Sequence, residues 1–167
     1  MTTQDKELLA IATLNRWDVP FLSSPFATDT NHPLELTDLL MQLIQSDSTR
    51  LKLGVTAFFL VHPEQAAVVL ETLPLLKKDF HRRLQYYYTA AVYLQRLWKS
   101  QLAGFGETQL PDYFSQELGL PSPAVLHGHI GLAFLEEALQ KEANETYNYR
   151  SSFDALVQIL LQRKEAK

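Results

Sequence analysis

Two arginines and two tyrosines are the side chains best suited to bind another molecule. They share one side of a helix predicted over residues 75–103: Arg82, Tyr86, Tyr93 and Arg96. Both residue types combine a large contact area with hydrogen bonding, and they are enriched where proteins bind one another. Arginine also neutralises phosphate and tyrosine stacks on unpaired bases, which is the chemistry of nucleic-acid binding. The four residues are our candidate site for a protein partner or a second copy of the chain, with nucleic acid as the alternative.

An internal role for the same tyrosines is a competing interpretation. Ala90 and Leu97 continue their line at helical spacing and complete an apolar row, named the tyrosine row: Tyr86, Ala90, Tyr93 and Leu97. Another side of the helix carries an ordinary core stripe: Phe80, Leu84, Tyr87, Ala91, Leu94 and Trp98. A long central helix that is covered on both sides needs two such rows, with tyrosine hydroxyls and arginine stems at their edges. The pattern alone does not decide whether the tyrosine row packs in the core or forms an interface.

One pair of histidines has a spacing that metal sites use. His127 and His129 are separated by one glycine where a helix is predicted to begin, and two imidazoles so placed can chelate a metal ion. A competent site needs a third ligand, and only the tertiary fold could bring His32, His62 or His81 close enough to serve. We therefore expect His127 to lie in a loop, His129 to flank the helix, and the protein to hold no metal and no cofactor.

The junction at residues 148–153 is a second polar cluster. Tyr149, Arg150 and two serines lie where a helix is predicted to begin, and a helix N-terminus of this kind can bind phosphate. The same residues also suit a helix cap preceded by a packed tyrosine, which is the interpretation we favour.

No pattern in the chain nominates a catalytic acid, base or nucleophile. The chain has no glycine-rich phosphate loop, no nucleophile elbow and no zinc-binding His-Glu-x-x-His helix. The carboxylate pair Glu136 and Glu137 diverges by about 100° on a helix, so one of the two is expected to face solvent. We predict a non-catalytic interaction or regulatory protein. A nucleic-acid-associated factor is the alternative, and a small-molecule enzyme comes third.

Composition is typical of a soluble protein with one domain. The 167 residues are 46% hydrophobic and 20% charged, which suffices for a core without disulfides or metal. There is no cysteine, the first residues are polar, and the longest apolar run is Leu53–Val61. A bilayer span needs about 20 apolar residues. The net charge is −4, yet residues 77–99 hold six basic residues and one acidic residue. We expect a soluble cytoplasmic protein with one basic helix and no membrane contact.

Capping residues and helical spacing predict an all-α domain of seven or eight helices, packed compactly around the helix 75–103. The other helices are expected at residues 3–15, from 33 or 37 to 46, 49–61, 63–73, 111–118, 128–143 and from 151 or 152 to 163. Residues 16–33 contain three prolines and several large apolar side chains, namely Trp17, Phe21, Leu22 and Phe26. We expect this stretch to be an irregular arm that packs across the core.

The turn between two of these helices has an aspartate followed three places later by an arginine. These are Asp47 and Arg50, and with the flanking helices residues 34–73 resemble a HEAT-type helical hairpin with the next helix appended. HEAT repeats stack into scaffolds that bind other macromolecules, so the resemblance implies a binding role. No second copy with comparable spacing is found in the sequence, whereas a solenoid needs at least three repeats.

Overall fold

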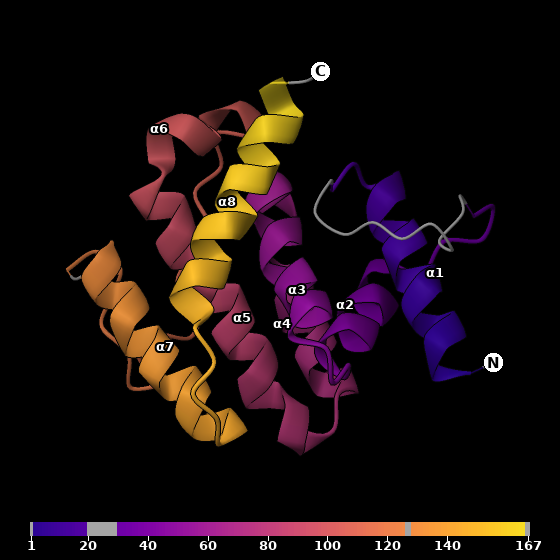
Figure 1. The fold of residues 1–167 in the computed structure, drawn as a ribbon, viewed down its shortest axis with the longest axis horizontal. Coiled ribbons are helices and arrows are strands. Elements are labelled where there is room, and N and C mark those ends of the chain that lie inside the picture. Colours follow the sequence, from indigo (N-terminus) through magenta and orange to yellow (C-terminus); the bar gives the residue numbers. More distant parts are fainter. Residues whose placement is uncertain (1, 20–29, 126–127, 166–167) are drawn as a thin grey trace.

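A buried helix, α5 (Lys78–Leu97), lies at the centre of the fold. Four helices pack against it: α2 (Leu36–Ile44), α3 (Thr49–Val61), α7 (His129–Ala143) and α8 (Tyr149–Glu165). The remaining α-helices are α1 (Thr3–Arg16), α4 (Val68–Thr72) and α6 (Lys99–Leu102). The structure, a computed structural model, describes residues 2–19, 30–125 and 128–165. These residues form eight α-helices and no strand, which confirms the predicted all-α fold (Figure 1).

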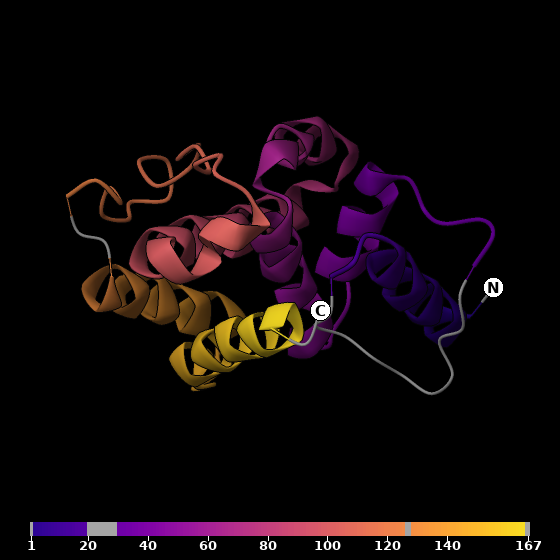
Figure 2. The same ribbon diagram turned by 90° about the horizontal axis from the view of Figure 1, so that it is seen from above.

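The central helix is covered on opposite sides. Figure 2 shows α7 and α8 on one side of α5 and the segment 106–125 on the other. At the far end of the molecule, α1 packs on α2 and α3. Every residue of α5 from Leu84 to Leu94 is buried as a result. The helix is therefore wrapped in the way that its two apolar rows require.

The second half of the core is α3. Its apolar run, Leu53–Val61, is buried along its whole length. Phe59 meets Tyr88 of α5 edge to face, with 5.1 Å between the ring centroids. The only polar side chain in the run is Thr56, and its hydroxyl donates a hydrogen bond of 2.7 Å to the carbonyl of Tyr87. This bond lets a polar group lie in the core without a lost hydrogen bond.

Capping residues set the N-termini of α1 and α3. Thr2 and Asp5 form a reciprocal capping box at the start of α1. The Ser48 hydroxyl accepts a hydrogen bond of 3.3 Å from the Leu51 amide, and α3 has the predicted bounds. The neighbouring Ser46 is buried and donates to Glu7 of α1 at 3.0 Å. The turn before α3 is thus fixed both to its own helix and to α1.

Replacing Ser48 by alanine is expected to lower the free energy of unfolding by about 1 kcal/mol, because the Leu51 amide loses its capping acceptor. Urea denaturation followed by circular dichroism measures the change. Ser100→Ala is the matched control, since Ser100 is exposed on α6, and it should change stability by less than about 0.5 kcal/mol. Equal effects of the two substitutions would show that the cap contributes nothing.

The long helix predicted over residues 75–103 is shorter in the structure. It begins at Lys78, because Leu76 and Lys77 are extended, with ψ angles of 149° and 148°. It ends at Leu97, because Trp98 has non-helical dihedrals (φ −108°, ψ 31°), and α6 and a 3-10 helix, Ala103–Phe105, follow. A single non-helical residue such as Trp98 hardly changes the spacing of the apolar side chains, so the sequence pattern does not show that the helix ends there.

The prediction of a short helix at residues 111–118 is wrong. The chain forms turns there, because Asp112 accepts hydrogen bonds from both the amide and the hydroxyl of Ser115 and closes a single turn. Gly119 ends the turns with a φ of 70°, a left-handed conformation that glycine adopts without strain.

Two other predicted helices differ in their bounds. The helix predicted at residues 63–73 is divided into a 3-10 helix, Pro63–Gln65, then α4, then a second 3-10 helix, Leu73–Leu75. The last helix begins at Tyr149 rather than at residue 151, because Asn148 accepts a hydrogen bond of 3.0 Å from the Ser151 amide and caps it earlier.

The start of the predicted arm covers part of the core. Trp17 packs edge to face on Phe58 and His62, at centroid distances of 5.7 Å and 5.3 Å. The carbonyl of Trp17 also lies 2.5 Å from Nε2 of His62. The arm's other large apolar residues, Phe21, Leu22 and Phe26, lie outside the described residues. In the described part of the chain, no helix is long and apolar enough to cross a membrane.

Candidate partner-binding site

The four residues of the predicted binding site do not form one exposed surface. Tyr93 has no exposed area and Tyr86 is 6% exposed. Arg96 is half-buried, and only Arg82 is exposed. In this chain the tyrosine row packs inside the molecule, as the competing interpretation of its spacing expects.

The segment that follows α6 covers one end of the tyrosine row. The Tyr93 hydroxyl donates a hydrogen bond of 2.5 Å to the Pro121 carbonyl. One turn further along α5, Arg96 donates to the Leu110 carbonyl at 3.2 Å. Burial raises the pKa of Tyr93, and the nearby carboxylate of Asp112 raises it further. Neither a protein partner nor a nucleobase can contact the Tyr93 ring while this segment is in place.

Two residues that the sequence did not single out also hold this segment. The Tyr88 hydroxyl donates to the Pro111 carbonyl at 2.7 Å, and its ring stacks on Tyr113 with 5.5 Å between centroids. Gln95 donates to the Thr108 carbonyl at 2.9 Å and accepts from the Leu110 amide at 2.7 Å. The tyrosine triplet 86–88 could have indicated the role of Tyr88. Three consecutive residues of a helix point in three directions, so only one of the three tyrosines can join the core stripe and the others must pack elsewhere.

A buried polar pair lies on the other side of α5. Tyr149 of α8 donates a hydrogen bond of 3.0 Å to the carboxylate of Glu145 and interacts with the hydroxyl of Tyr87. Burial raises the pKa of both tyrosines. The hydroxyls are therefore kept protonated and able to donate.

The N-terminus of α8 is already satisfied by the chain itself. The Arg150 amide donates to the carboxylate of Glu136 at 2.9 Å, where the phosphate interpretation would place an anion. The junction at residues 148–153 is thus a capped helix start. Glu137 diverges from its neighbour as predicted and forms an exposed ion pair with Lys141 at 3.2 Å.

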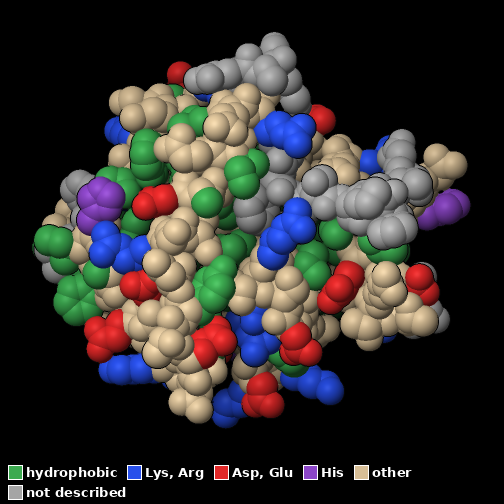
Figure 3. Space-filling model, viewed as in Figure 1, with side chains coloured by type: hydrophobic (Ala, Val, Ile, Leu, Met, Phe, Trp, Pro, Cys, Tyr) green, Lys and Arg blue, Asp and Glu red, His purple; other side chains and the backbone are tan. Residues whose placement is uncertain are grey.

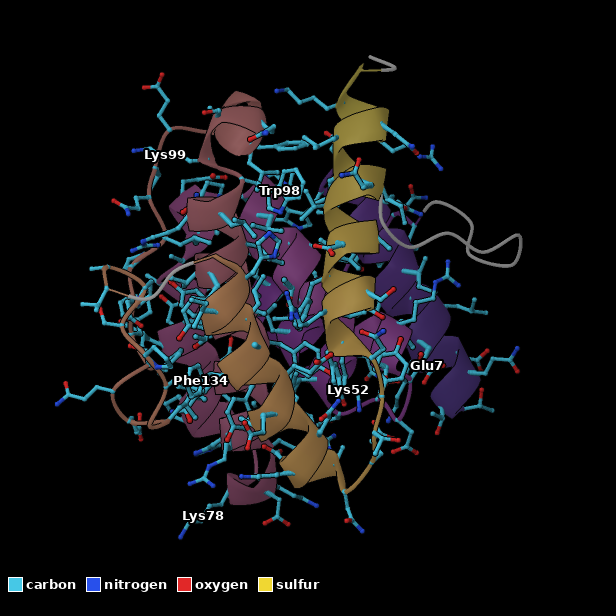
Figure 4. The ribbon with its side chains drawn as sticks, turned by 60° about the vertical axis from the view of Figure 1, so that its left-hand side comes forward. Glu7, Lys52, Lys78, Trp98, Lys99 and Phe134 are labelled. Carbon is cyan, nitrogen blue, oxygen red and sulfur yellow. The ribbon has the colours of Figure 1, made fainter. Side chains whose placement is uncertain are left out.

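Charged groups from three helices meet beside the first turns of α5. Burial lowers the pKa of Lys52, and the charge of Arg83 lowers it further. Burial raises the pKa of Glu142, an effect that Arg83 and Arg82 oppose. Figure 4 shows Lys52 close to the N-terminal end of α8. Arg82 thus belongs to a charged rim where α3, α5 and α7 come together.

The histidine pair is only partly described. His127 lies outside the described residues. His129 is the first residue of α7, and its Nδ1 atom lies 3.5 Å from the Arg150 guanidinium. Within residues 2–19, 30–125 and 128–165, no three His, Cys, Asp or Glu side chains are grouped so that they could hold a metal ion.

An exposed apolar pair on α7 is the surface feature that the sequence analysis missed. Ile130 is 57% exposed and Phe134 is 48% exposed, one helical turn apart, and Val125 in the preceding segment is 75% exposed. Figure 3 shows hydrophobic side chains at the edge of the molecule that α7 forms, and Figure 4 shows Phe134 on the side of α7 towards the segment 106–125. Helical spacing could have predicted this exposed pair, because leucines 132, 135 and 139 share the buried face of α7 and residues 130 and 134 lie on the opposite face.

A scan against protein-family models and searches of curated proteins and of solved structures found no match to this chain. The HEAT-type resemblance of residues 34–73 therefore stays a prediction, although α2 and α3 do pack against each other as a helical pair.

Proposed function

We propose that this protein is a non-catalytic interaction protein that binds another protein chain, a partner or a second copy, through the outer face of α7. The observation that carries the proposal is the exposed pair Ile130 and Phe134. Burying a large apolar side chain fully contributes roughly 1.5–3 kcal/mol. A helix that presents two of them one turn apart is suited to an apolar groove or to the face of another helix.

The surroundings of the pair support this function. Glu137 and Lys141 continue the same face of α7 and pair with each other in solvent. Arg82 is exposed on α5, close enough to Glu142 near the end of α7 that its charge opposes the rise in the pKa of Glu142 caused by burial. An apolar centre with a charged rim is the usual composition of a protein–protein interface. Arg82 is therefore the one predicted binding residue that we retain.

Replacing Phe134 by aspartate is expected to weaken binding by about 30-fold, or about 2 kcal/mol, which is typical of an aromatic residue at the centre of an interface. Sedimentation velocity over a range of concentrations measures self-association. Affinity purification from the native host, quantified by mass spectrometry, compares the partners that the wild type and the variant retain. The fold should survive, because Phe134 is about half exposed in the isolated chain.

Leu75→Asp is the matched control, because Leu75 is 58% exposed on a different element. It introduces the same charge in place of an apolar side chain and should leave binding unchanged. Binding by Phe134→Asp that equals the wild type would contradict the proposal. So would an equal loss in both variants, since it would indicate a general effect of added charge.

A further inference from the structure

A pocket lies at the C-terminal end of α5, apart from the outer face of α7. It has a volume of about 560 Å³ and opens between α5, α6 and residues 106–109 and 123–124. Pockets that hold small molecules span about 300–1,000 Å³, so this one has the size for a compact ligand. Figure 4 shows Lys99, one of its lining residues, at this end of the molecule.

The wall of the pocket is partly apolar. Leu102 of α6 and Pro123 are buried and line it. Ala103 and Ala124 also line it and are exposed, so they lie towards its mouth. Small side chains at this point leave the space open. A ligand here would gain apolar contact on the side of α6 and the 123–124 segment.

Among the described residues, Arg96 forms no ion pair in the pocket, although Glu107 is also part of the lining. Arg96 donates to the Leu110 carbonyl at 3.2 Å, and its Nε and Nη2 atoms lie 2.9 Å and 3.3 Å from one end of the Gln109 side-chain amide, which accepts from them when the amide is oriented with its oxygen there. Both acceptors are neutral, and among the described residues no carboxylate forms an ion pair with Arg96. Burial lowers the pKa of Arg96, an effect that the more distant Asp112 opposes. A half-buried charge with neutral partners is stabilised by an anion that enters beside it.

We propose that this pocket binds a small amphipathic organic anion, with one carboxylate, sulfonate or phosphate group attached to a compact apolar body. The anionic group would lie against Arg96 and Lys99, and the apolar body against Leu102 and Pro123. Glu107 is exposed at the lining and carries the opposite charge, so the site favours a head group of low charge over a polyanion. This ligand site shares no lining residue with the proposed protein-binding pair, Ile130 and Phe134.

Binding of 8-anilinonaphthalene-1-sulfonate to the folded full-length chain tests the proposal. This probe joins a sulfonate to an apolar body, and N-phenyl-1-naphthylamine is the neutral probe of the same shape. We expect saturable binding of the sulfonate at one site and much weaker binding of the neutral probe. Lys99→Gln should weaken sulfonate binding about fivefold, and Glu107→Gln should strengthen it by a similar factor, because each removes one charge near the head group.

Two tryptophan substitutions locate the site. Ala124→Trp should abolish binding by filling the mouth of the pocket, whereas Ala143→Trp, at the exposed end of α7, should leave it unchanged. Circular dichroism confirms that each variant is folded. Binding that survives Ala124→Trp, or equal affinity for the neutral probe, would overturn the proposal. So would loss of dye binding in Phe134→Asp, since it would assign the dye to α7; unchanged dye binding in that variant is the expected result.

Discussion

Replacing Tyr93 by alanine is expected to lower the free energy of unfolding by about 3–5 kcal/mol, the range for deleting a large aromatic side chain from a core. The ring has no exposed area, and its hydroxyl donates to the Pro121 carbonyl. The substitution leaves a cavity beside α5 and an unpaired carbonyl in the segment that covers it. Urea denaturation followed by circular dichroism should show a lower midpoint with an unchanged slope.

Two further substitutions show which part of Tyr93 is responsible. Tyr93→Phe keeps the ring and removes only the hydroxyl, so it should cost about 1–3 kcal/mol, the penalty for leaving the Pro121 carbonyl unpaired. Arg82→Ala changes an exposed member of the same predicted site and should cost less than about 0.5 kcal/mol. If Tyr93→Ala were as stable as the wild type, the tyrosine row would have to be a surface.

Raising the pH above about 10, the pKa of tyrosine in an unfolded chain, is expected to unfold the protein. Burial raises the pKa of four tyrosines well above that value: Tyr87, Tyr88, Tyr93 and Tyr149. Because the folded pKa values are the higher ones, the unfolded chain releases these protons first as the pH rises. Their contribution to stability is complete below pH 10 and is lost above it, by about 1.4 kcal/mol per pH unit for each tyrosine.

Absorbance of tyrosinate near 295 nm and circular dichroism, recorded in one alkaline titration, measure this effect. The buried tyrosines should ionise together with the loss of helicity, because a tyrosinate cannot donate to the Pro111 or Pro121 carbonyl. Tyr93→Phe should make stability fall less steeply with pH, by about one proton. If all seven tyrosines ionised near pH 10 in a chain that keeps its helicity, the buried network would be contradicted.

Local signals were sufficient for most of the helices. The bounds of α3 were predicted from Ser48 and the apolar run after it, and the helix predicted at residues 128–143 is found as α7. A cap acts on the amides of the next turn, so it can be recognised from a few neighbouring residues. The prediction of a helix at residues 111–118 failed, because Asp112 closes a single turn by accepting from Ser115 and the Pro111 carbonyl accepts from Tyr88 of α5 instead of from a helical amide.

Spacing along the chain established that this protein is all-α and that the helix 78–97 carries two apolar rows. It also left the tyrosine row open between core and interface, since helical period describes which side chains share a face but not what lies opposite. That choice depends on the path of residues 106–125, which bring the Pro121 carbonyl to Tyr93 from 28 residues away. The folded chain buries the tyrosine row, because α5 is covered from both sides, and it leaves Ile130 and Phe134 exposed, because they lie on the face of α7 opposite its buried leucines.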